Sequence, residues 1–232
     1  MSWSSYGGDP GGTRYAPLAQ IDRGNVGELE VAWSYRTGES GEGFASQGKM
    51  AFEVTPILAQ GRLYLSTPLS TVIALDPATG EELWRHDPGI DRTRRYAEAT
   101  SRGVSSWQDA DAAPDAPCAH RIFLGTLDGR LIALDGSTGR SCADFGEGGT
   151  VDLTVDVRLT DPGQYTITSL PAIAGDLVIT GSAIGDNRAV DLELGIVQAF
   201  DARSGGGSGS GTLSRAIRPI RHMLTGSPSR RR

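Results

Sequence analysis

Short runs of apolar residues recur along this chain, and each leads into the same kind of turn. Residues 71–75 read Thr-Val-Ile-Ala-Leu and residues 130–134 read Arg-Leu-Ile-Ala-Leu. Runs of this length, rich in aliphatic and β-branched residues and bounded by turn residues, are typical of β-strands. Helical periodicity is nearly absent from the first two hundred residues. The pattern therefore predicts an all-β protein.

The turn after each strand belongs to one phrase that occurs three times. The copies are Ala-Leu-Asp-Pro-Ala-Thr-Gly at 74–80, Ala-Leu-Asp-Gly-Ser-Thr-Gly at 133–139 and Ala-Phe-Asp-Ala-Arg-Ser-Gly at 199–205, offset by 59 and 66 residues. The Asp side chain can cap the chain reversal, and the Gly supplies a positive φ angle. A strand, a tight turn and another strand at this period predict the blades of a β-propeller.

Length and composition agree with a propeller. The chain has 232 residues with 32 Gly and 6% aromatic residues, which suits short strands and many turns. No apolar run reaches the roughly eighteen residues of a membrane span, and the first residues do not form a signal peptide. We therefore expect an exported product to begin after its targeting segment or to have lost it.

Two cysteines, Cys118 and Cys142, flank the second copy of the phrase. In an oxidising compartment they can form a disulfide, and otherwise they remain two free thiols. The sequence alone does not set the distance between them, so both alternatives stay open.

The charge distribution divides the chain at residue 205. Residues 1–205 hold 16 basic and 28 acidic residues, a net charge of −12, whereas residues 206–232 hold six arginines and no acid. An acidic body argues against nucleic acid as a partner. The sequence predicts a partial propeller at 1–205 and a basic, low-complexity tail at 206–232.

The tail admits two interpretations. Apolar residues at helical spacing from Leu213 to Leu224, with arginines between them, would suit a membrane-surface helix. Pro219 opposes that helix, because an interior proline costs about 3 kcal/mol. The chain uses 21 Arg and one Lys, which indicates a GC-rich coding sequence whose shifted frame would yield Gly, Ser, Arg and Pro. We expect the tail to be disordered or out of frame.

Several motifs give the chain a family resemblance. Residues 3–9 (Trp-Ser-Ser-Tyr-Gly-Gly-Asp), 14–18, 32–38, 53–57 and 102–104 resemble, in order, motifs of the pyrroloquinoline quinone (PQQ)-dependent dehydrogenases. They are most similar to the branch of membrane-bound glucose, quinate and polyol dehydrogenases. The resemblance implies an eight-bladed β-propeller whose blades dock through a Trp-bearing version of the repeated phrase. The chain would hold the N-terminal portion, about half, of that propeller.

The resemblance also implies a cofactor site. PQQ is a planar tricarboxylate quinone, so its site needs cations, hydrogen-bond donors and a hard divalent metal, Ca²⁺ or Mg²⁺. Arg102 matches the family arginine at the quinone oxygens, and Arg36 would be a second cation; each is otherwise a surface arginine. Glu53 matches a glutamate at the cofactor's carboxylate edge, or is a solvated strand end. Thr168 matches a hydrogen-bond donor, and Ser182 would line the same cavity.

The metal position follows from the same resemblance. Asp186 matches the acidic residue that binds the metal on PQQ, and Asn187 beside it offers a second suitable oxygen. Without the resemblance, this pair would be a plain loop turn. No residue of this chain matches the family's catalytic Asp, which would lie beyond the matching region.

Two departures from the family motifs leave the substrate open. The alcohol-oxidising branch has adjacent cysteines shortly before its arginine, whereas residues 96–101 contain none. Many glucose-type members have a histidine four residues before that arginine, and here the position is Glu98. These differences point away from methanol and ethanol enzymes but do not name a substrate.

The resemblance implies the N-terminal part of a periplasmic quinoprotein dehydrogenase. The full-length relative would oxidise a sugar or polyol and pass electrons to ubiquinone, and we expect this fragment to be inactive alone. Its open propeller faces favour self-association. The alternatives are a non-catalytic propeller scaffold and the product of a degraded gene. A scaffold needs no cofactor wall, so the joint presence of Glu53, Arg102, Thr168 and Asp186 argues against it.

Overall fold

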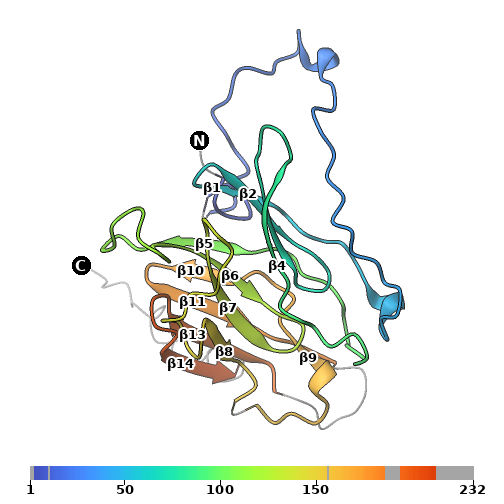
Figure 1. The fold of residues 1–232 in the computed structure, drawn as a ribbon, viewed down its shortest axis with the longest axis vertical. Helices are drawn as coiled ribbons and strands as arrows, with labels where there is room; N and C mark the ends of the chain where they lie inside the picture. Colours follow the sequence, from blue (N-terminus) through green and yellow to red (C-terminus); the bar gives the residue numbers. More distant parts are fainter. Residues whose placement is uncertain (1–2, 10, 156, 186–193, 213–232) are drawn as a thin grey trace, which may run out of the picture.

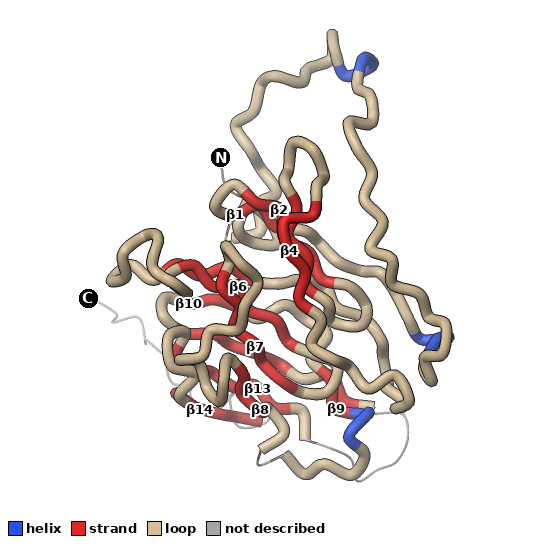
Figure 2. The backbone as a smooth tube through the Cα atoms, in the orientation of Figure 1, coloured by secondary structure: helices blue, strands red, loops and turns tan. Residues whose placement is uncertain are grey.

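The regular structure of this chain consists of β-strands. The computed structural model describes residues 3–9, 11–155, 157–185 and 194–212, so the predicted metal residues Asp186 and Asn187 lie outside the described residues. The helical elements of the described part are three short 3₁₀ turns, η1 (Val26–Glu28), η2 (Gln47–Lys49) and η3 (Pro162–Gln164) (Figure 2). The described residues contain no helix that could span a bilayer. The prediction of an all-β protein is confirmed.

Three four-stranded antiparallel sheets, each with its strands in sequence order, form the described part of the chain (Figure 1). The first contains β1 (Ile57–Ala59), β2 (Arg62–Ser66), β3 (Val72–Leu75) and β4 (Glu82–His86). The second contains β5 (Ser105–Gln108), β6 (His120–Gly125), β7 (Arg130–Asp135) and β8 (Thr150–Asp152). The third contains β10 (Ala172–Ala174), β11 (Leu177–Gly181), β13 (Ile196–Asp201) and β14 (Gly207–Thr212). A separate pair joins β9 (Tyr165–Thr166) to β12 (Ala183–Ile184).

The repeated phrase forms the turn between the third and fourth strands of each sheet, as its Asp and Gly predicted. The Asp76 carboxylate accepts hydrogen bonds from the backbone N–H groups of Ala78 and Thr79, at 2.8 and 2.9 Å. Asp201 makes the equivalent bonds in the third sheet. These bonds to the ionised carboxylate hold the pKa of both aspartates below its usual value. Gly80 closes the first turn with φ +73°.

Neighbouring sheets pack face to face through two apolar layers. Between the first and second sheets, Tyr64 and Trp84 pack with Ile122 and Leu134 in one buried cluster. Between the second and third sheets, the cluster includes the residues Phe123, Phe145, Val178 and Phe200. Stacked four-stranded sheets joined in this way are blades of a propeller, so the three sheets are the three predicted repeats.

A tryptophan of the first blade docks on the turn of the second. The Trp84 Nε1–H donates to the Gly136 carbonyl at 3.0 Å, and the Tyr64 hydroxyl donates to the same carbonyl at 2.9 Å. The Trp84 ring lies against Gly139, where a Cβ atom would come within 2.5 Å of the ring. The repeated glycine therefore serves both the turn, at φ +71°, and the docking of the ring.

The same docking occurs before the first blade. The Trp33 Nε1–H donates to the Pro77 carbonyl at 3.2 Å, and the Trp33 ring occupies the space where Gly80 would carry a Cβ. Trp33 belongs to residues 29–37, an extended segment without strand pairing. This segment follows an N-terminal loop that extends away from the sheets (Figure 1). Val31 in this segment is 83% exposed. The segment thus occupies the position of an outer strand of a further blade, as β4 does for the first.

The third sheet is completed by the residues of the predicted tail. Gly207–Thr212 pairs with β13, with a register irregularity between Ala199 and Phe200. Gly209 stands at the position that Trp84 has in the first repeat. The division of the chain at residue 205 stays a prediction.

Charged side chains reinforce the contact between the second and third blades. Arg203, in the third repeat, donates through Nε and Nη2 to Asp109 at 3.0 and 2.8 Å, and through Nη1 to Asp176 at 2.9 Å. Its guanidinium also lies 5.1 Å from the centroid of the buried Trp107 ring. These carboxylates raise the pKa of Arg203 further.

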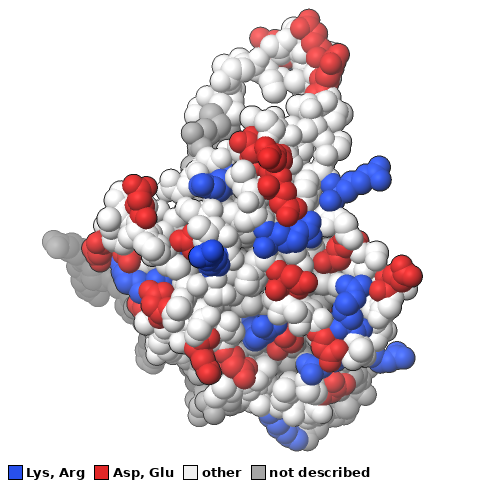
Figure 3. Space-filling view, viewed as in Figure 1, with Lys and Arg blue, Asp and Glu red and all other residues white. Residues whose placement is uncertain are grey.

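Acidic and basic side chains are interspersed over the face of the molecule in Figure 3.

Cys118 and Cys142 form a disulfide in this structure, which settles the alternative that the sequence left open. The bond closes a loop across the second blade, with a sequence separation of 24 residues. We expect reduction to lower the free energy of unfolding by about 3 kcal/mol, because the bond restricts the unfolded chain. Urea unfolding with and without a phosphine reductant measures the loss. A Cys118→Ser/Cys142→Ser variant should be as unstable as the reduced chain and insensitive to reductant.

Candidate functional site

Three connecting segments run side by side over the sheets and lead into the first strand of each blade. They are residues 49–55, 97–102 and 163–168, which precede β1, β5 and β10. The Ala51 N–H donates to Ala99 O at 3.0 Å, and the Ala97 N–H donates to Gly163 O at 2.9 Å. The middle segment is therefore hydrogen-bonded to both others.

The predicted cofactor residues occupy equivalent positions on these segments. Glu53 lies four residues before β1, Arg102 three residues before β5, and Thr168 four residues before β10. Each blade repeats the same chain path, so equivalent positions of successive blades come to the same place on one face. Residues separated by 49 and 66 positions in the sequence thus meet.

Arg102 is the centre of this cluster. Its Nη1 donates to the Thr168 hydroxyl at 2.7 Å, and its Nη2 lies 3.1 Å from Oε2 of Glu53. The backbone repeats the connection: Arg102 N–H donates to Thr168 O at 2.9 Å, and Thr55 N–H donates to Arg102 O at 3.1 Å. The Arg102 and Glu53 side chains remain 41% and 45% exposed, so the guanidinium is oriented yet open to a ligand. A role with a cofactor remains a prediction.

Gly103 lets the connecting segments approach each other beside Arg102. Its φ is +144°, and a Cβ there would come within 3.1 Å of the Thr55 carbonyl oxygen. Because a side chain would strain both the backbone and this contact, the glycine supports the position of the neighbouring arginine.

Glu98 is a member of the cluster that sequence reasoning missed. Its Oε2 lies 3.9 Å from Nη2 of Arg102, and the side chain is 54% exposed. In the sequence, Glu98 stands out only as a departure from the glucose-type motif. Its opposite charge, four residues before the arginine, was the signal available. With Glu98, the described cluster contains one guanidinium and two carboxylates.

The structure does not bring Arg36 to this cluster. Its side chain is exposed and, among the described residues, makes no hydrogen bond or ion pair. The residues on either side, Tyr35 and Thr37, accept hydrogen bonds from Arg85 of β4 at 2.8 and 3.0 Å. Arg36 therefore lies in the extended segment beside β4, away from the Arg102 cluster.

Ser182 makes its described hydrogen bond within the third blade. Its hydroxyl accepts a hydrogen bond from Ile196 N–H at 3.0 Å, at the start of β13. The next residue, Ala183, pairs with Thr166, two residues before Thr168. Ser182 thus lies close to the third connecting segment in the fold, but no described contact joins it to Arg102.

The described donors fit a quinone more clearly than a metal. A guanidinium with an oriented planar fork suits quinone oxygens, and carboxylate oxygens suit a hard cation. Cys118, Cys142 and Asp144 also bring potential metal ligands together, within 4.8 Å. Their two sulfurs are joined in the disulfide, so that group has a single carboxylate to offer.

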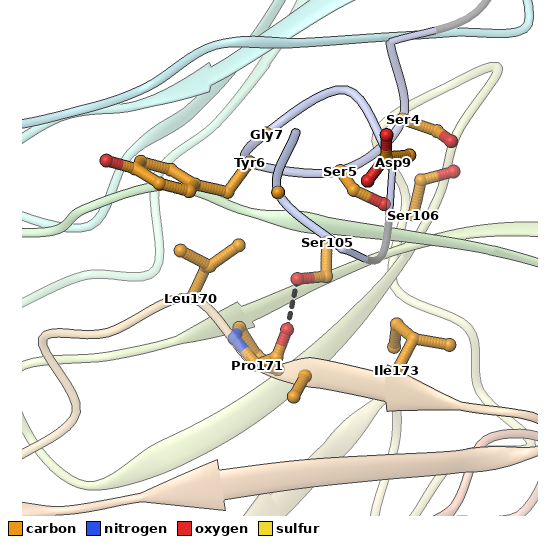
Figure 4. Close-up of a pocket in the computed structure, with 12 residues that line it drawn as sticks. Ser4, Ser5, Tyr6, Gly7, Asp9, Ser105, Ser106, Leu170, Pro171 and Ile173 are labelled. Carbon is orange, nitrogen blue, oxygen red and sulfur yellow. Dashed lines mark hydrogen bonds between the residues drawn. The ribbon is translucent and has the colours of Figure 1, made fainter. Parts of the chain in front are cut away.

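A pocket of about 360 Å³ lies elsewhere, where the N-terminal segment crosses β5 and the approach to β10 (Figure 4). Its hydroxyl groups largely have partners inside the protein. Ser105 donates to the Pro171 carbonyl, and Ser106 lies 2.8 Å from Nε2 of His120. Burial lowers the pKa of His120 to about 4, so the imidazole is neutral at physiological pH. None of the predicted cofactor residues lines this pocket.

Comparison with known proteins gives consistent matches. The β-propeller domain of glucose, ethanol and alcohol dehydrogenases matches residues 3–208. A quinoprotein glucose dehydrogenase of Gluconobacter oxydans is 39% identical over 88% of this chain and 26% of its own length. A quinate/shikimate dehydrogenase (quinone) of Acinetobacter baylyi is 34% identical over 88% of this chain and 27% of its own length.

Solved structures show the same fold. A quinohemoprotein alcohol dehydrogenase from Pseudomonas putida superposes with a TM-score of 0.70 at 32% identity, covering 91% of this chain and 26% of that protein. The enzyme from Comamonas testosteroni gives 0.68 at 30% identity, covering 91% of this chain and 27% of that protein. The chain therefore spans about a quarter of the length of the relatives that it matches.

Proposed function

The chain belongs to the glucose/ethanol/alcohol dehydrogenase β-propeller family, and we propose that it is the N-terminal part of a PQQ-dependent sugar, polyol or quinate dehydrogenase. One observation carries the proposal: Arg102 is held by Glu53 and Thr168, at equivalent positions of three consecutive blades. A non-catalytic scaffold does not need an oriented, half-exposed guanidinium at that point.

Each residue of the cluster has a distinct part in holding the cofactor. PQQ, when bound, supplies a quinone that accepts the electrons removed from a substrate hydroxyl. Arg102 would donate to its oxygens, because a guanidinium stays charged and presents several N–H groups in one plane. The hydrogen bond to Thr168 and the ion pair with Glu53 restrict the rotation of that plane. Ser182 and Arg36, predicted as further cofactor residues, lie outside this cluster, and the proposal assigns neither a direct contact with the cofactor.

The remainder of the proposed enzyme follows from the family. Ca²⁺ or Mg²⁺ would bind at Asp186 and Asn187, and the full propeller would have eight blades. The substrate would be a sugar or polyol, the electron acceptor ubiquinone and the compartment the periplasm. The catalytic Asp would lie beyond the matching region, so this chain alone would be inactive.

Open edges give the isolated chain a tendency to self-associate. The extended segment at residues 29–37 has unpaired backbone groups, and Val31 and Leu29 in it are 83% and 60% exposed. An unpaired, apolar strand recruits other strands. For residues 206–232 we keep the proposal of a low-complexity tail. The product of a degraded gene, read out of frame in this tail, stays the alternative.

Titration of PQQ into the purified chain with Ca²⁺ present tests the cofactor assignment. We expect saturable but weak binding, because a site shared with further blades has only part of its contacts here. Equilibrium dialysis measures the bound fraction, and near-UV circular dichroism verifies that the chain is folded. A folded chain that takes up no PQQ would favour the scaffold.

A further inference from the structure

A second pocket crosses the same three connecting segments at their upstream ends. It has a volume of about 470 Å³. Its lining comes from the first segment and the residues before it, from the approach to the second segment, and from the third. The lining residues are Ala45, Ser46, Gly48, Lys49, Arg95, Tyr96 and Gln164.

Two cations line this pocket without partners. Lys49 and Arg95 are exposed, and neither side chain makes a hydrogen bond or ion pair with any described residue. Six other arginines of the described chain form ion pairs with carboxylates. No carboxylate is among the lining residues, although residues 1–205 carry a net charge of −12. Two unpaired cations in one hollow of an acidic protein indicate a site for an anion.

The pocket is separate from the Arg102 cluster. Lys49 precedes Glu53 by four residues, and Gln164 precedes Thr168 by four. Four residues of extended chain span roughly 13 Å, and none of Glu53, Arg102 and Thr168 lines this pocket. A ligand here would be near the proposed cofactor face and outside the reacting position.

We propose that this pocket binds the carboxylate of a polyhydroxy acid and concentrates such a substrate beside the cofactor face. Lys49 and Arg95 would donate charge-assisted hydrogen bonds to the carboxylate. The half-buried Gln164 amide can donate to, and accept from, hydroxyl groups. The volume of about 470 Å³ admits a six-carbon ring that carries a carboxylate. The choice of substrate class rests on the proposed function, whereas anion binding itself does not.

Quinate is the probe for the test, because it carries one carboxylate and several hydroxyls. Chemical-shift titration of the full chain without PQQ measures its affinity, with inorganic phosphate and glucose titrated in parallel. We expect quinate to bind more tightly than phosphate, and glucose to leave the pocket resonances unchanged. The Lys49→Gln/Arg95→Gln variant should bind quinate at least about tenfold more weakly, because neutral amides that can still donate hydrogen bonds replace two cations.

Arg23→Gln is the matched control, since Arg23 is another exposed arginine without a described partner. It should leave quinate affinity unchanged. Equal quinate affinity in the double variant and the unmodified chain would overturn the site. Tighter binding of phosphate than of quinate would overturn the polyhydroxy acid. Because no PQQ is present, a failure of the proposed cofactor function appears separately, as absent PQQ binding by the unmodified chain.

Discussion

The Trp84→Ala variant should lose about 4 kcal/mol of unfolding free energy, a large part of the stability of a small domain. Trp84 fills the contact between the first two blades, where its ring covers Gly139 and its Nε1–H donates to Gly136 O. Its removal leaves a cavity in that apolar layer and a carbonyl with one donor fewer. Urea unfolding followed by far-UV circular dichroism measures the change without depending on tryptophan fluorescence.

Leu83→Ala is the control on the same strand. Leu83 is 45% exposed and adjacent to Trp84, so its truncation should change the unfolding free energy by less than about 1 kcal/mol. Gly139→Ala should approach the tryptophan variant in effect, because it places a Cβ against the ring at a positive φ angle. If Trp84→Ala were no more destabilising than Leu83→Ala, docking through the repeated phrase would not stabilise the blades.

The Arg102→Ala variant should weaken PQQ binding at least about a hundredfold, the loss expected for two charge-assisted hydrogen bonds. The removed guanidinium is the cation of the described cluster, and it contacts both Glu53 and Thr168. The PQQ affinity of the Arg102→Lys variant should lie between those of the unmodified chain and Arg102→Ala, because lysine keeps the charge and loses the planar fork. Equilibrium dialysis at constant Ca²⁺ gives the three affinities.

Arg36→Ala is the informative comparison for this measurement. Arg36 was predicted as a second cofactor cation, whereas the structure has it in the extended segment beside β4, without a described contact to Arg102. We therefore expect a change of no more than about twofold, the size of an exposed electrostatic effect. Equal losses for both variants would contradict the central position of Arg102 and restore Arg36 as a direct contact.

The local features of the blades could be predicted from the sequence because they depend on neighbouring residues. An Asp that accepts from the N–H groups two and three residues onward, and a Gly at positive φ, form their turn wherever they stand. The strands before Asp76 and Asp135 follow from their apolar runs. Local character does not account for residues 207–212, whose Gly-Ser sequence lacks strand propensity and yet pairs with β13. There the neighbouring strand supplies the order.

The sequence by itself determined the repeat, its turns, the all-β class and the family, all of which are recorded in local order along the chain. Only the tertiary structure decided which distant residues meet. It brought Glu53 and Thr168 to Arg102, added Glu98, left Arg36 apart, and joined Cys118 to Cys142. These meetings depend on how successive blades stack, because stacking superimposes the same point of each repeat, and no single segment contains that information.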